Sequence, residues 1–414
     1  MAINRVFTRK VRILVAPLDW GLGHATRCIP IIREFLQRDA EVLIAAEGPV
    51  SVLLKQEFPT LEILELRGYR IKYARTATGL AFGMLKQIPR ILQSIRREKK
   101  WLDNIIKSHQ IDVIISDNRY GLYSGKIPSV FISHQLTIKT GSVFTEKILR
   151  KFNYKFINRF TECWVPDKPG PFNYAGALSH PPVLPRIPVF YTGILSRLNP
   201  AATTVIPKHL FISLSGPEPQ RSIFEEKIIS QVSHYNHSAT IVRGLPGEER
   251  MIPSTNSLRF FNHLPAVCIS EEMAKADLVI TRSGYSTIMD LVTMNKKSIL
   301  VPTPGQTEQV YLAGYLTEKK IAMGVGQAGF NLVDVIERAK DFFGNNPSPD
   351  EKTGDDLPEK ISEYGNLARP ASGQNTVVNT MNPNTGGLSR PSADSHQQGS
   401  LSLVIDRLLE KISV

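Results

Sequence analysis

Cysteine is scarce in this sequence. Only Cys28, Cys163 and Cys268 occur among 414 residues, and their spacing matches neither a disulfide framework nor a metal-binding motif. A disulfide-stapled secreted domain and a cysteine-based metal site are therefore excluded, and a reducing cytoplasm is the expected location.

Long hydrophobic runs are also missing. No uninterrupted apolar stretch reaches the roughly 20 residues that a helix needs to cross a bilayer. Residues 1–17 lack the apolar centre of a signal peptide and lead straight into a strand pattern. We therefore expect a cytoplasmic protein, with peripheral contact to the inner face of the cell membrane left open.

Several catalytic signatures are absent as well. The sequence has no G-x-S-x-G nucleophile elbow and no G-x-x-x-x-G-K-[ST] phosphate loop, which weighs against an esterase and an NTPase. It also has no D-x-D, no H-E-x-x-H and no cluster of Cys and His residues. We therefore expect neither a metal nor a cofactor.

What the chain does have is an alternation of short β-rich apolar runs with helical patterns. This rhythm is typical of the doubly wound parallel α/β sheet, and 414 residues suffice for two such domains. The predicted parts are a domain over 1–190, a second over 191–345, a flexible low-complexity segment over 346–399 and an amphipathic helix over 400–414. Strands are predicted at 11–16, 41–46, 61–66, 111–116, 129–133, 163–165, 209–214, 240–243, 257–261, 278–281 and 298–302.

The net charge is +12, from 50 Lys and Arg against 38 Asp and Glu. Much of the excess falls in residues 67–107, a less regular segment in which apolar and aromatic residues are interleaved with basic ones. Such a segment could lie on an anionic membrane surface, or it could be a packed helix with a solvated basic face. Nucleic acid is not the expected partner, because no helix-turn-helix, zinc-finger or RNP signature accompanies the charge.

The most informative stretch is Leu278–Gln309. Its pattern is a strand, a tight turn at Arg282-Ser283-Gly284, a helix opened by Ser286 and Thr287, a second strand and a polar loop. A glycine turn at a helix N-terminus offers unpaired backbone N–H groups to a diphosphate, and Asp290 could accept hydrogen bonds from ribose hydroxyls. An ordinary strand–helix–strand unit with polar loops is the alternative on spacing alone.

This stretch resembles the donor-nucleotide half of GT-B glycosyltransferases, closest to family 28, that of the peptidoglycan lipid-intermediate N-acetylglucosaminyltransferase. The family pattern R-S-G-x-x-T-x-x-E, followed by V-P and a loop with Gln, appears without a gap. Asp290 replaces the family's ribose-binding Glu, while Val310 and Ala313 replace a second loop Gln and the following Asn. The first change shortens the reach of the carboxylate, and the other two leave the donor sugar open.

The resemblance implies two Rossmann-like domains that face a cleft, with the last helix crossing back to the first domain. It implies metal-independent transfer of an N-acetylhexosamine or hexose from a UDP-sugar, as co-substrate, to a hydroxyl acceptor, either lipid-linked or a cell-envelope glycan. Helix dipoles and basic residues would offset the charge of the departing diphosphate. The implied donor-binding residues are Ser215, Gly216, Arg243, His263, Leu264, Arg282, Ser283, Gly284, Ser286, Thr287, Asp290, Thr307, Glu308 and Gln309. For Arg243 an ordinary surface role stays open, and for Arg282 a structural ion pair.

A second focus is the loop Asp19–His24, which resembles the family's G-G-T-x-G-H loop, with Gly21 in the third position, Gly23 in the fifth and His24 matched, whereas Asp19 and Trp20 replace the two leading glycines. The resemblance gives His24 a place in the cleft, where a neutral imidazole could accept the proton of the acceptor hydroxyl. Alternatively, His24 only caps or packs the helix. Asp117 is the reserve candidate for the general base.

The acceptor side is expected at the ends of two further strands. Asn118 follows the predicted strand 111–116, and His134 and Gln135 end the next one, in a segment resembling the family's H-E-Q. Each could instead be a hydrogen-bonded loop residue. Three rival functions stay open: a UDP-sugar epimerase of the same fold, a non-catalytic sugar-nucleotide-binding subunit and, more weakly, a nucleic-acid-binding protein.

Overall fold

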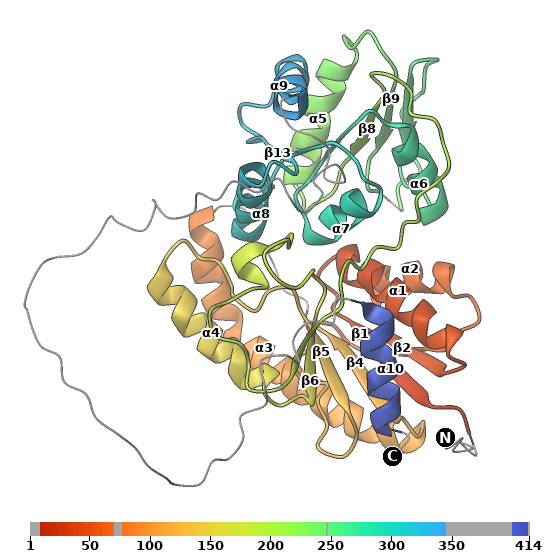
Figure 1. Cartoon of the computed structure of the whole chain (residues 1–414), viewed down its shortest axis with the longest axis vertical. Coiled ribbons are helices and arrows are strands. Elements are labelled where there is room, and N and C mark those ends of the chain that lie inside the picture. Colours follow the sequence, from red (N-terminus) through yellow and green to blue (C-terminus); the bar gives the residue numbers. More distant parts are fainter. Residues whose placement is uncertain (1–8, 70–76, 246, 345–399, 413–414) are drawn as a thin grey trace, which may run out of the picture.

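The computed structural model describes residues 9–69, 77–245, 247–344 and 400–412. The predicted flexible segment 346–399 lies outside the described residues, as do Arg70, Lys72 and Arg75 of the basic segment. Two α/β domains stand one above the other, and the chain passes between them after residue 191 (Figure 1).

The N-terminal domain has a seven-stranded sheet of order β3-β2-β1-β4-β5-β6-β7, in which the neighbouring strands run parallel. The order reverses between β1 and β4. Their carboxyl ends therefore form the kind of switch point at which open α/β sheets bind ligands. The strands are β1 (Arg12–Pro17), β2 (Glu41–Ala46), β3 (Ile63–Glu65), β4 (Val113–Asp117), β5 (Ser129–Ile132), β6 (Glu162–Val165) and β7 (Val189–Tyr191).

Helices cover both faces of this sheet, as the alternation along β1 requires. Ile13 and Val15 pack into the cluster formed with α1 and α2, whereas Leu14 and Ala16 pack against α3 residues such as Leu102. The helices are α1 (Leu22–Gln37), α2 (Gly48–Glu57), α3 (Ala77–Ser108) and α4 (Val143–Ile157), with a short 3₁₀ turn, η1 (Gly176–Leu178).

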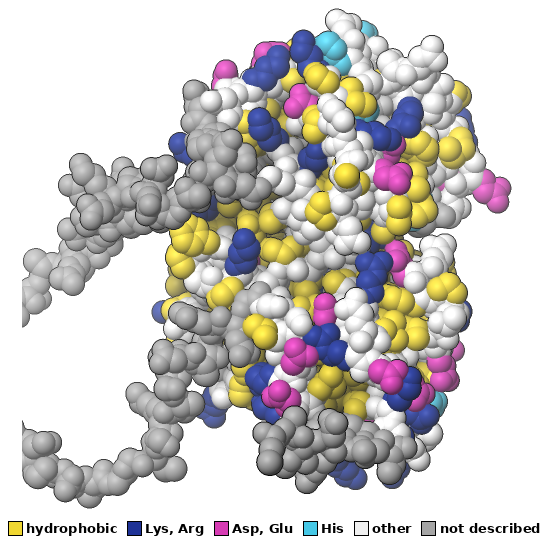
Figure 2. Space-filling view, turned by 45° about the vertical axis from the view of Figure 1, so that its right-hand side comes forward, with side chains coloured by type: hydrophobic (Ala, Val, Ile, Leu, Met, Phe, Trp, Pro, Cys, Tyr) yellow, Lys and Arg dark blue, Asp and Glu magenta, His cyan; other side chains and the backbone are white. Residues whose placement is uncertain are grey.

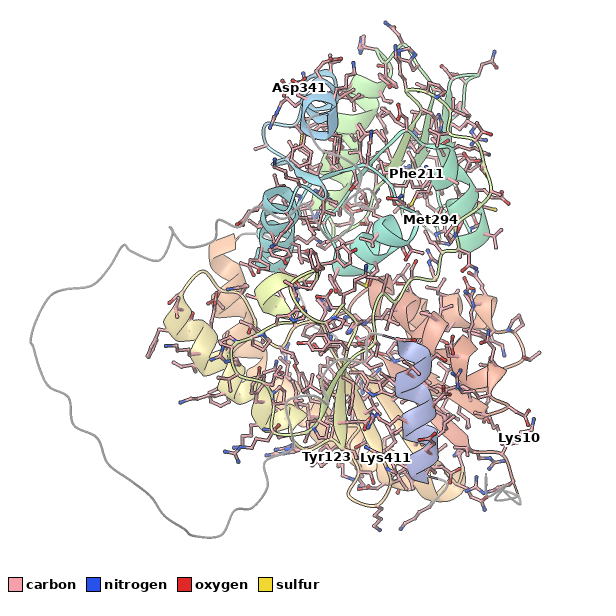
Figure 3. All side chains as sticks on the ribbon, in the orientation of Figure 1. Lys10, Tyr123, Phe211, Met294, Asp341 and Lys411 are labelled. Atoms are coloured by element: carbon pink, nitrogen blue, oxygen red, sulfur yellow. The ribbon has the colours of Figure 1, made fainter. Side chains whose placement is uncertain are left out.

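The C-terminal domain repeats the plan with a six-stranded parallel sheet of order β10-β9-β8-β11-β12-β13. Here the order reverses between β8, where Phe211 (Figure 3) is completely buried, and β11. The strands are β8 (Leu210–Ser213), β9 (Ala239–Val242), β10 (Leu258–Phe261), β11 (Leu278–Thr281), β12 (Ser298–Leu300) and β13 (Met323–Gly324). The helices are α5 (Gln220–Val232), α6 (Ala266–Lys275), α7 (Tyr285–Thr293), α8 (Thr307–Glu318) and α9 (Leu332–Gly344).

The last helix, α10 (Leu401–Ile412), lies against the N-terminal domain beside α1 (Figure 1). Val404, Ile405 and Leu408 are buried in the same core cluster as α1 and β1. Arg407 donates a hydrogen bond of 2.7 Å to Glu162, a buried carboxylate on β6. The expectation that the last helix crosses back to the first domain is therefore confirmed.

The doubly wound α/β architecture is confirmed, and several details differ from the prediction. The boundary placed at 190/191 cuts through β7, because the N-terminal sheet extends to Tyr191. The segment expected to be less regular is largely one helix, α3, which runs through Pro89. The two-residue strand β13 was not predicted, because it is too short to produce a periodic pattern. Within the described residues, no helix is both long and apolar enough to span a membrane.

Candidate active site between the two domains

The N-termini of α1 and α7 meet between the two domains. Ser286 Oγ donates a hydrogen bond of 2.9 Å to the carbonyl oxygen of Gly23. A Cβ on Gly23 would lie 2.9 Å from that Oγ, so only glycine permits this approach. Gly21, the N-cap of α1, has φ 92°, which also favours glycine. Gly23 therefore serves the close approach of two positive helix ends, whereas Gly21 serves the backbone turn that leads into α1.

His24 and Asp117 are brought together at the switch point of the N-terminal sheet. His24 lies in the first turn of α1, and its Nδ1 is 3.1 Å from Oδ2 of Asp117, the last residue of β4. Arg27, one turn further along α1, forms a two-armed ion pair with the same carboxylate, with its Nε 2.9 Å from Oδ2. Asp117 is fully buried and Arg27 is 3% exposed, so this pair is shielded from solvent.

The network continues across the domain boundary through His134. Nη1 of Arg27 is 3.0 Å from Nδ1 of His134, and Nε2 of His134 is 2.7 Å from Oε1 of Glu308 on α8. The ring of Tyr285, on α7, stacks on the His134 imidazole at a centroid distance of 4.2 Å. His134, which was predicted to lie on the acceptor side, is thus held by two residues of the C-terminal domain, one of which, Glu308, was predicted to contact the donor.

Burial and charge oppose each other in this network. Burial, with help from Arg27 and His134, lowers the pKa of His24 in spite of Asp117. Burial alone would raise the pKa of Asp117 and of Glu308, but Arg27 and the histidines outweigh it and hold both below their ordinary values. At neutral pH the site therefore holds two carboxylates, one guanidinium and a neutral His24.

Asp290 lies on α7 with its carboxylate turned toward the interdomain connection. Its Oδ1 accepts a hydrogen bond of 2.5 Å from Ser196 Oγ, and Arg197 lies near enough to lower its pKa. Burial dominates and raises that pKa to about 6. Nε and Nη1 of Arg197 are buried without a hydrogen-bond partner among the described residues. Residues 196 and 197 were not among the predicted site residues.

Three of the predicted donor-binding residues shape the loops. Arg282 is 1% exposed and donates hydrogen bonds to the carbonyls of Ser215, Gln220 and Val301, and burial lowers its pKa to about 10. Ser283 donates a hydrogen bond of 2.8 Å to the backbone carbonyl of Gln309, and the Gln309 side chain accepts one from the backbone of Thr303. These bonds fix the loops after β8 and β12 relative to each other.

Further predicted donor residues lie at the carboxyl edge of the C-terminal sheet and differ in their exposure to solvent. Ser215 and Gly216 are exposed after β8, whereas Leu264 is buried in the core. Gly284 is the N-cap of α7, and Thr287 is half-buried in its first turn. Thr307 is exposed and donates a hydrogen bond to the carbonyl of Lys139, in the N-terminal domain.

Arg243 and His263 follow β9 and β10, the two outer strands on one side of this sheet. Arg243 is paired with Glu225 and donates a hydrogen bond of 2.6 Å to Asn262, so its guanidinium is largely engaged. His263 is half-buried; burial and, after it, the charge of Arg197 lower its pKa. His263 therefore shares a neighbourhood with the interdomain connection.

The other two residues predicted for the acceptor side, Asn118 and Gln135, form hydrogen bonds through their backbone atoms. Asn118 has φ 55° and donates its backbone N–H to Ile132. Gln135 accepts a hydrogen bond of 3.1 Å at its carbonyl from Asn153 on α4. Side chains fill the space between the two domains (Figure 3). Among the described residues, no three His, Cys, Asp or Glu side chains are grouped so that they could hold a metal ion.

A separate cavity of about 460 Å³ lies in the C-terminal domain at the amino ends of its strands. Its lining includes Lys208, Leu210, Leu278, Lys297 and Lys340, and none of the predicted site residues. It is therefore at the opposite edge of the sheet from the site.

Comparisons with known proteins agree with this arrangement. Residues 251–361 match the glycosyltransferase family 28 C-terminal domain. An uncharacterized glycosyltransferase of Methanosarcina acetivorans is 26% identical over 328 residues, covering 72% of this chain and 79% of the relative. A UDP-N-acetylglucosamine--N-acetylmuramyl-(pentapeptide) pyrophosphoryl-undecaprenol N-acetylglucosamine transferase of Methylorubrum extorquens is 30% identical over 153 residues, covering 35% of this chain and 36% of that one.

Two solved structures share the architecture. The glycotransferase of kitacinnamycin has a TM-score of 0.55 at 13% identity and covers 81% of this chain and 91% of its own. The spinosyn rhamnosyltransferase SpnG has a TM-score of 0.55 at 17% identity and covers 82% and 98%. At these identities the likeness concerns the fold, which is that of GT-B glycosyltransferases. The chain is a family-28-like glycosyltransferase of the GT-B fold.

The part that matches family 28, residues 251–361, includes β11, α7, β12 and α8. The sequence prediction did not include Arg27, Tyr285, Ser196 and Arg197. The spacing of His24 and Arg27, three residues apart on a helix, could have indicated that both face β4. Nothing in the local pattern indicated that Tyr285 stacks on His134 in the other domain.

Proposed function

We propose that this glycosyltransferase transfers an N-acetylhexosamine or hexose from a UDP-sugar to a hydroxyl acceptor in the cleft between its domains. The observation that carries the proposal is the pair of the half-buried His24 and the buried Asp117, positioned beside the contact between the α1 and α7 N-termini. One group suited to take a proton thus lies next to two helix ends suited to hold a diphosphate.

His24 would act as the general base. The acceptor hydroxyl oxygen attacks the anomeric carbon, its proton passes to Nε2 of His24, and the bond between the anomeric carbon and the phosphate oxygen breaks. Asp117 would stabilise the imidazolium that forms, through Nδ1. The lowered pKa of His24 keeps the ring neutral at pH 7, which a base requires.

The departing diphosphate would be stabilised by the two helix N-termini. The first turns of α1 and α7 contain no acidic residue, so their free backbone N–H groups and positive dipole ends are not already neutralised. The exposed loop of Ser215 and Gly216 adds backbone groups at the same edge. Charge developing on the leaving group would thus meet fixed dipoles, without a need for a metal ion.

Asp290, Arg197 and His263 would hold the nucleoside. The Asp290 carboxylate already accepts a hydroxyl hydrogen bond from Ser196, and a ribose hydroxyl is the same kind of donor. Arg197 has buried N–H groups without partners, which a uracil carbonyl or a phosphate oxygen would satisfy. Thr307, Glu308 and Gln309 would face the sugar from the start of α8.

Calorimetric titration tests the donor assignment. UDP, UDP-N-acetylglucosamine, TDP, ADP and GDP are titrated into the wild type, Asp290→Ala and, as a control, Asp341→Ala on the exposed face of α9. Selective binding of the uridine nucleotides that weakens at least tenfold in Asp290→Ala alone is expected, since a charge-assisted hydrogen bond contributes about 1.5–3 kcal/mol. Tighter binding of another base, or equal affinity in both variants, would overturn the assignment.

We further propose that the acceptor is lipid-borne and that the N-terminal domain rests on an anionic membrane surface. On α4, the exposed side chains Phe144, Ile148 and Phe152 form a stripe at helical spacing. A second stripe beside it carries Lys147, Lys151 and Lys155, and Arg159 follows just after the end of the helix; all four are exposed. Apolar and basic stripes side by side suit a helix lying at a lipid headgroup layer.

The basic segment 67–107 was the sequence candidate for this contact, with a packed helix as the alternative. Its described part contributes the exposed residues Arg90, Arg96, Arg97 and Lys100 on α3, which lies near α4 (Figure 1). On the face shown in Figure 2, by contrast, Lys and Arg side chains are interspersed with Asp and Glu. We therefore assign the membrane contact to α4, supported by α3.

Vesicle flotation tests this assignment. Full-length protein is mixed with neutral vesicles or with vesicles containing anionic phospholipid. Binding to the anionic vesicles that falls at least fivefold in Phe144→Ser/Phe152→Ser is expected, while Val267→Ser, an equally exposed apolar position on α6, retains it. Equal binding by both variants would contradict the assignment.

A further inference from the structure

Arg27 is the central residue of the hydrogen-bond network that joins His24, Asp117, His134 and Glu308. It belongs to none of the recognised motifs, yet its guanidinium contacts Asp117, His24 and His134. We propose that Arg27 is a positioning residue that determines which ring nitrogen of His24 and of His134 carries the proton. The inference deepens the proposed transfer reaction, because the role of His24 as base depends on that proton.

His134 shows the principle in its simpler form. A guanidinium only donates hydrogen bonds, so the Nδ1 atom that faces Nη1 of Arg27 at 3.0 Å must present a lone pair. The proton of the neutral ring then sits on Nε2, where it is donated to Glu308 over 2.7 Å. Cation, imidazole and carboxylate form one polarised chain, and Glu308 completes it from the C-terminal domain.

At His24 two neighbours make opposite demands on the same atom. Nη2 of Arg27, at 2.7 Å, requires a lone pair on Nδ1, whereas Oδ2 of Asp117, at 3.1 Å, requires a proton there. The shorter contact is the one to Arg27. In the resting protein Nδ1 is therefore unprotonated, and Nε2 carries a proton that it can donate to an oxygen in the cleft.

General-base action needs the other tautomer. Nε2 can accept the proton of the acceptor hydroxyl only when Nδ1 holds a proton and donates it to Asp117. Arg27 can release His24 without leaving the carboxylate, because its Nε remains 2.9 Å from Oδ2. A small turn of the guanidinium thus converts His24 from a hydrogen-bond donor into a base.

A purely structural ion pair makes a different prediction. If Arg27 only neutralises Asp117, removing it would destabilise the domain without a specific change at Nδ1 of His24. The charged and titratable groups around His24 are Asp117 on β4, Arg27 and Cys28 on α1, His134 after β5 and Glu308 on α8. Of these, Arg27 is the one that donates to Nδ1.

Nitrogen NMR of ¹⁵N-histidine-labelled full-length protein at pH 8 tests the inference. His24→Asn and His134→Asn assign the two rings among the nine histidines. In the wild type, both rings should be neutral, with the proton on Nε2. In Arg27→Met, which removes every donor, Nδ1 of His24 should gain a proton. Arg33→Gln, on the same helix but paired with Glu57, should match the wild type.

A wild-type spectrum with the proton on Nδ1 of either ring would overturn the inference, as would an unchanged His24 signal in Arg27→Met. The wild-type spectrum needs no variant, so a variant that fails to fold leaves the test standing. Since Arg27 also lowers the pKa of His24, the acidic limb of kcat against pH should move to higher pH in Arg27→Met. The NMR result does not require turnover, so absence of transfer would refute the proposed function alone.

Discussion

Ser286 of the C-terminal domain donates a hydrogen bond of 2.9 Å to the backbone carbonyl of Gly23 in the N-terminal domain. The contact joins the first turns of α7 and α1, so the loops that lead into these two helices are held at a fixed separation. Glycine is needed at position 23, because a methyl group there would meet the same hydroxyl.

Gly23→Ala should therefore separate the two helix ends and slow transfer. The added Cβ would lie 2.9 Å from Ser286 Oγ, and an overpacking cost of about 1–2 kcal/mol corresponds to a loss of roughly tenfold in kcat/KM. Placed in a Ser286→Ala background, the same change should cost much less, because the Oγ is gone and the next atom is 3.5 Å away.

Gly314→Ala, on α8, is the matched control, because its Cβ would meet nothing within 4 Å. If Gly23→Ala were equally harmful with and without the Ser286 hydroxyl, close approach of the helices would not be its reason.

Asp290→Asn should stabilise the folded protein at neutral pH. The pKa of Asp290 is raised from 3.8 to about 6, so between these values the folded chain keeps a proton that the unfolded chain has released. The free energy of unfolding therefore falls as pH rises through this window, and the full cost is present above pH 6. The gain for Asp290→Asn should be about 2–3 kcal/mol at pH 7.5 and small at pH 4.

Denaturant unfolding at the two pH values measures this difference, with Asp341→Asn as the control. Asp341 lies on the exposed side of α9, at the end of the molecule far from the interdomain region (Figure 3). A gain of the same size at pH 4 and pH 7.5 would mean that the Asp290 carboxylate is not the source.

Leu408→Ala should destabilise the N-terminal domain, although residue 408 follows the whole C-terminal domain in the sequence. Leu408 is 1% exposed in the core shared with α1 and β1, and a buried Leu-to-Ala change costs about 2–5 kcal/mol. Leu403, on the same helix, is 54% exposed, so Leu403→Ala should change the free energy of unfolding by no more than about 0.5 kcal/mol. Chemical denaturation of the two variants checks this, and equal costs would show that α10 is not part of the core.

The sequence predicted the secondary-structure elements of the proposed donor half well, because their signals are local. β11 was placed at its observed bounds, Leu278–Thr281, because a short apolar run, a glycine turn and a helical pattern follow each other without a gap. Parallel strands end at one edge of a sheet, so the observed proximity of His24, Asp117 and His134 follows from topology, although the three residues were predicted as separate candidates.

The parts that the sequence did not predict depend on contacts between domains. Glu308 was expected at the sugar, but it also binds His134 across the cleft. Asp290 contacts Ser196, which lies in the connection between the domains. No periodicity in one segment reports on a partner in another domain. The exposed stripe of α4 was missed because its apolar residues follow the same spacing as a buried helix face.

The most direct test of the central claim is product formation measured by mass spectrometry. Full-length protein is incubated with a lipid extract and either UDP-N-acetylglucosamine or UDP-hexoses. Three forms are compared: the wild type, His24→Asn and, as a control, His234→Asn, in which the changed histidine is exposed and remote from the cleft. We predict UDP release and a glycosylated product for the wild type and His234→Asn. In His24→Asn, turnover should fall roughly 10²–10⁴-fold while UDP affinity is retained. Undiminished turnover in His24→Asn, or a sugar nucleotide converted without any acceptor, would contradict transfer with His24 as its base.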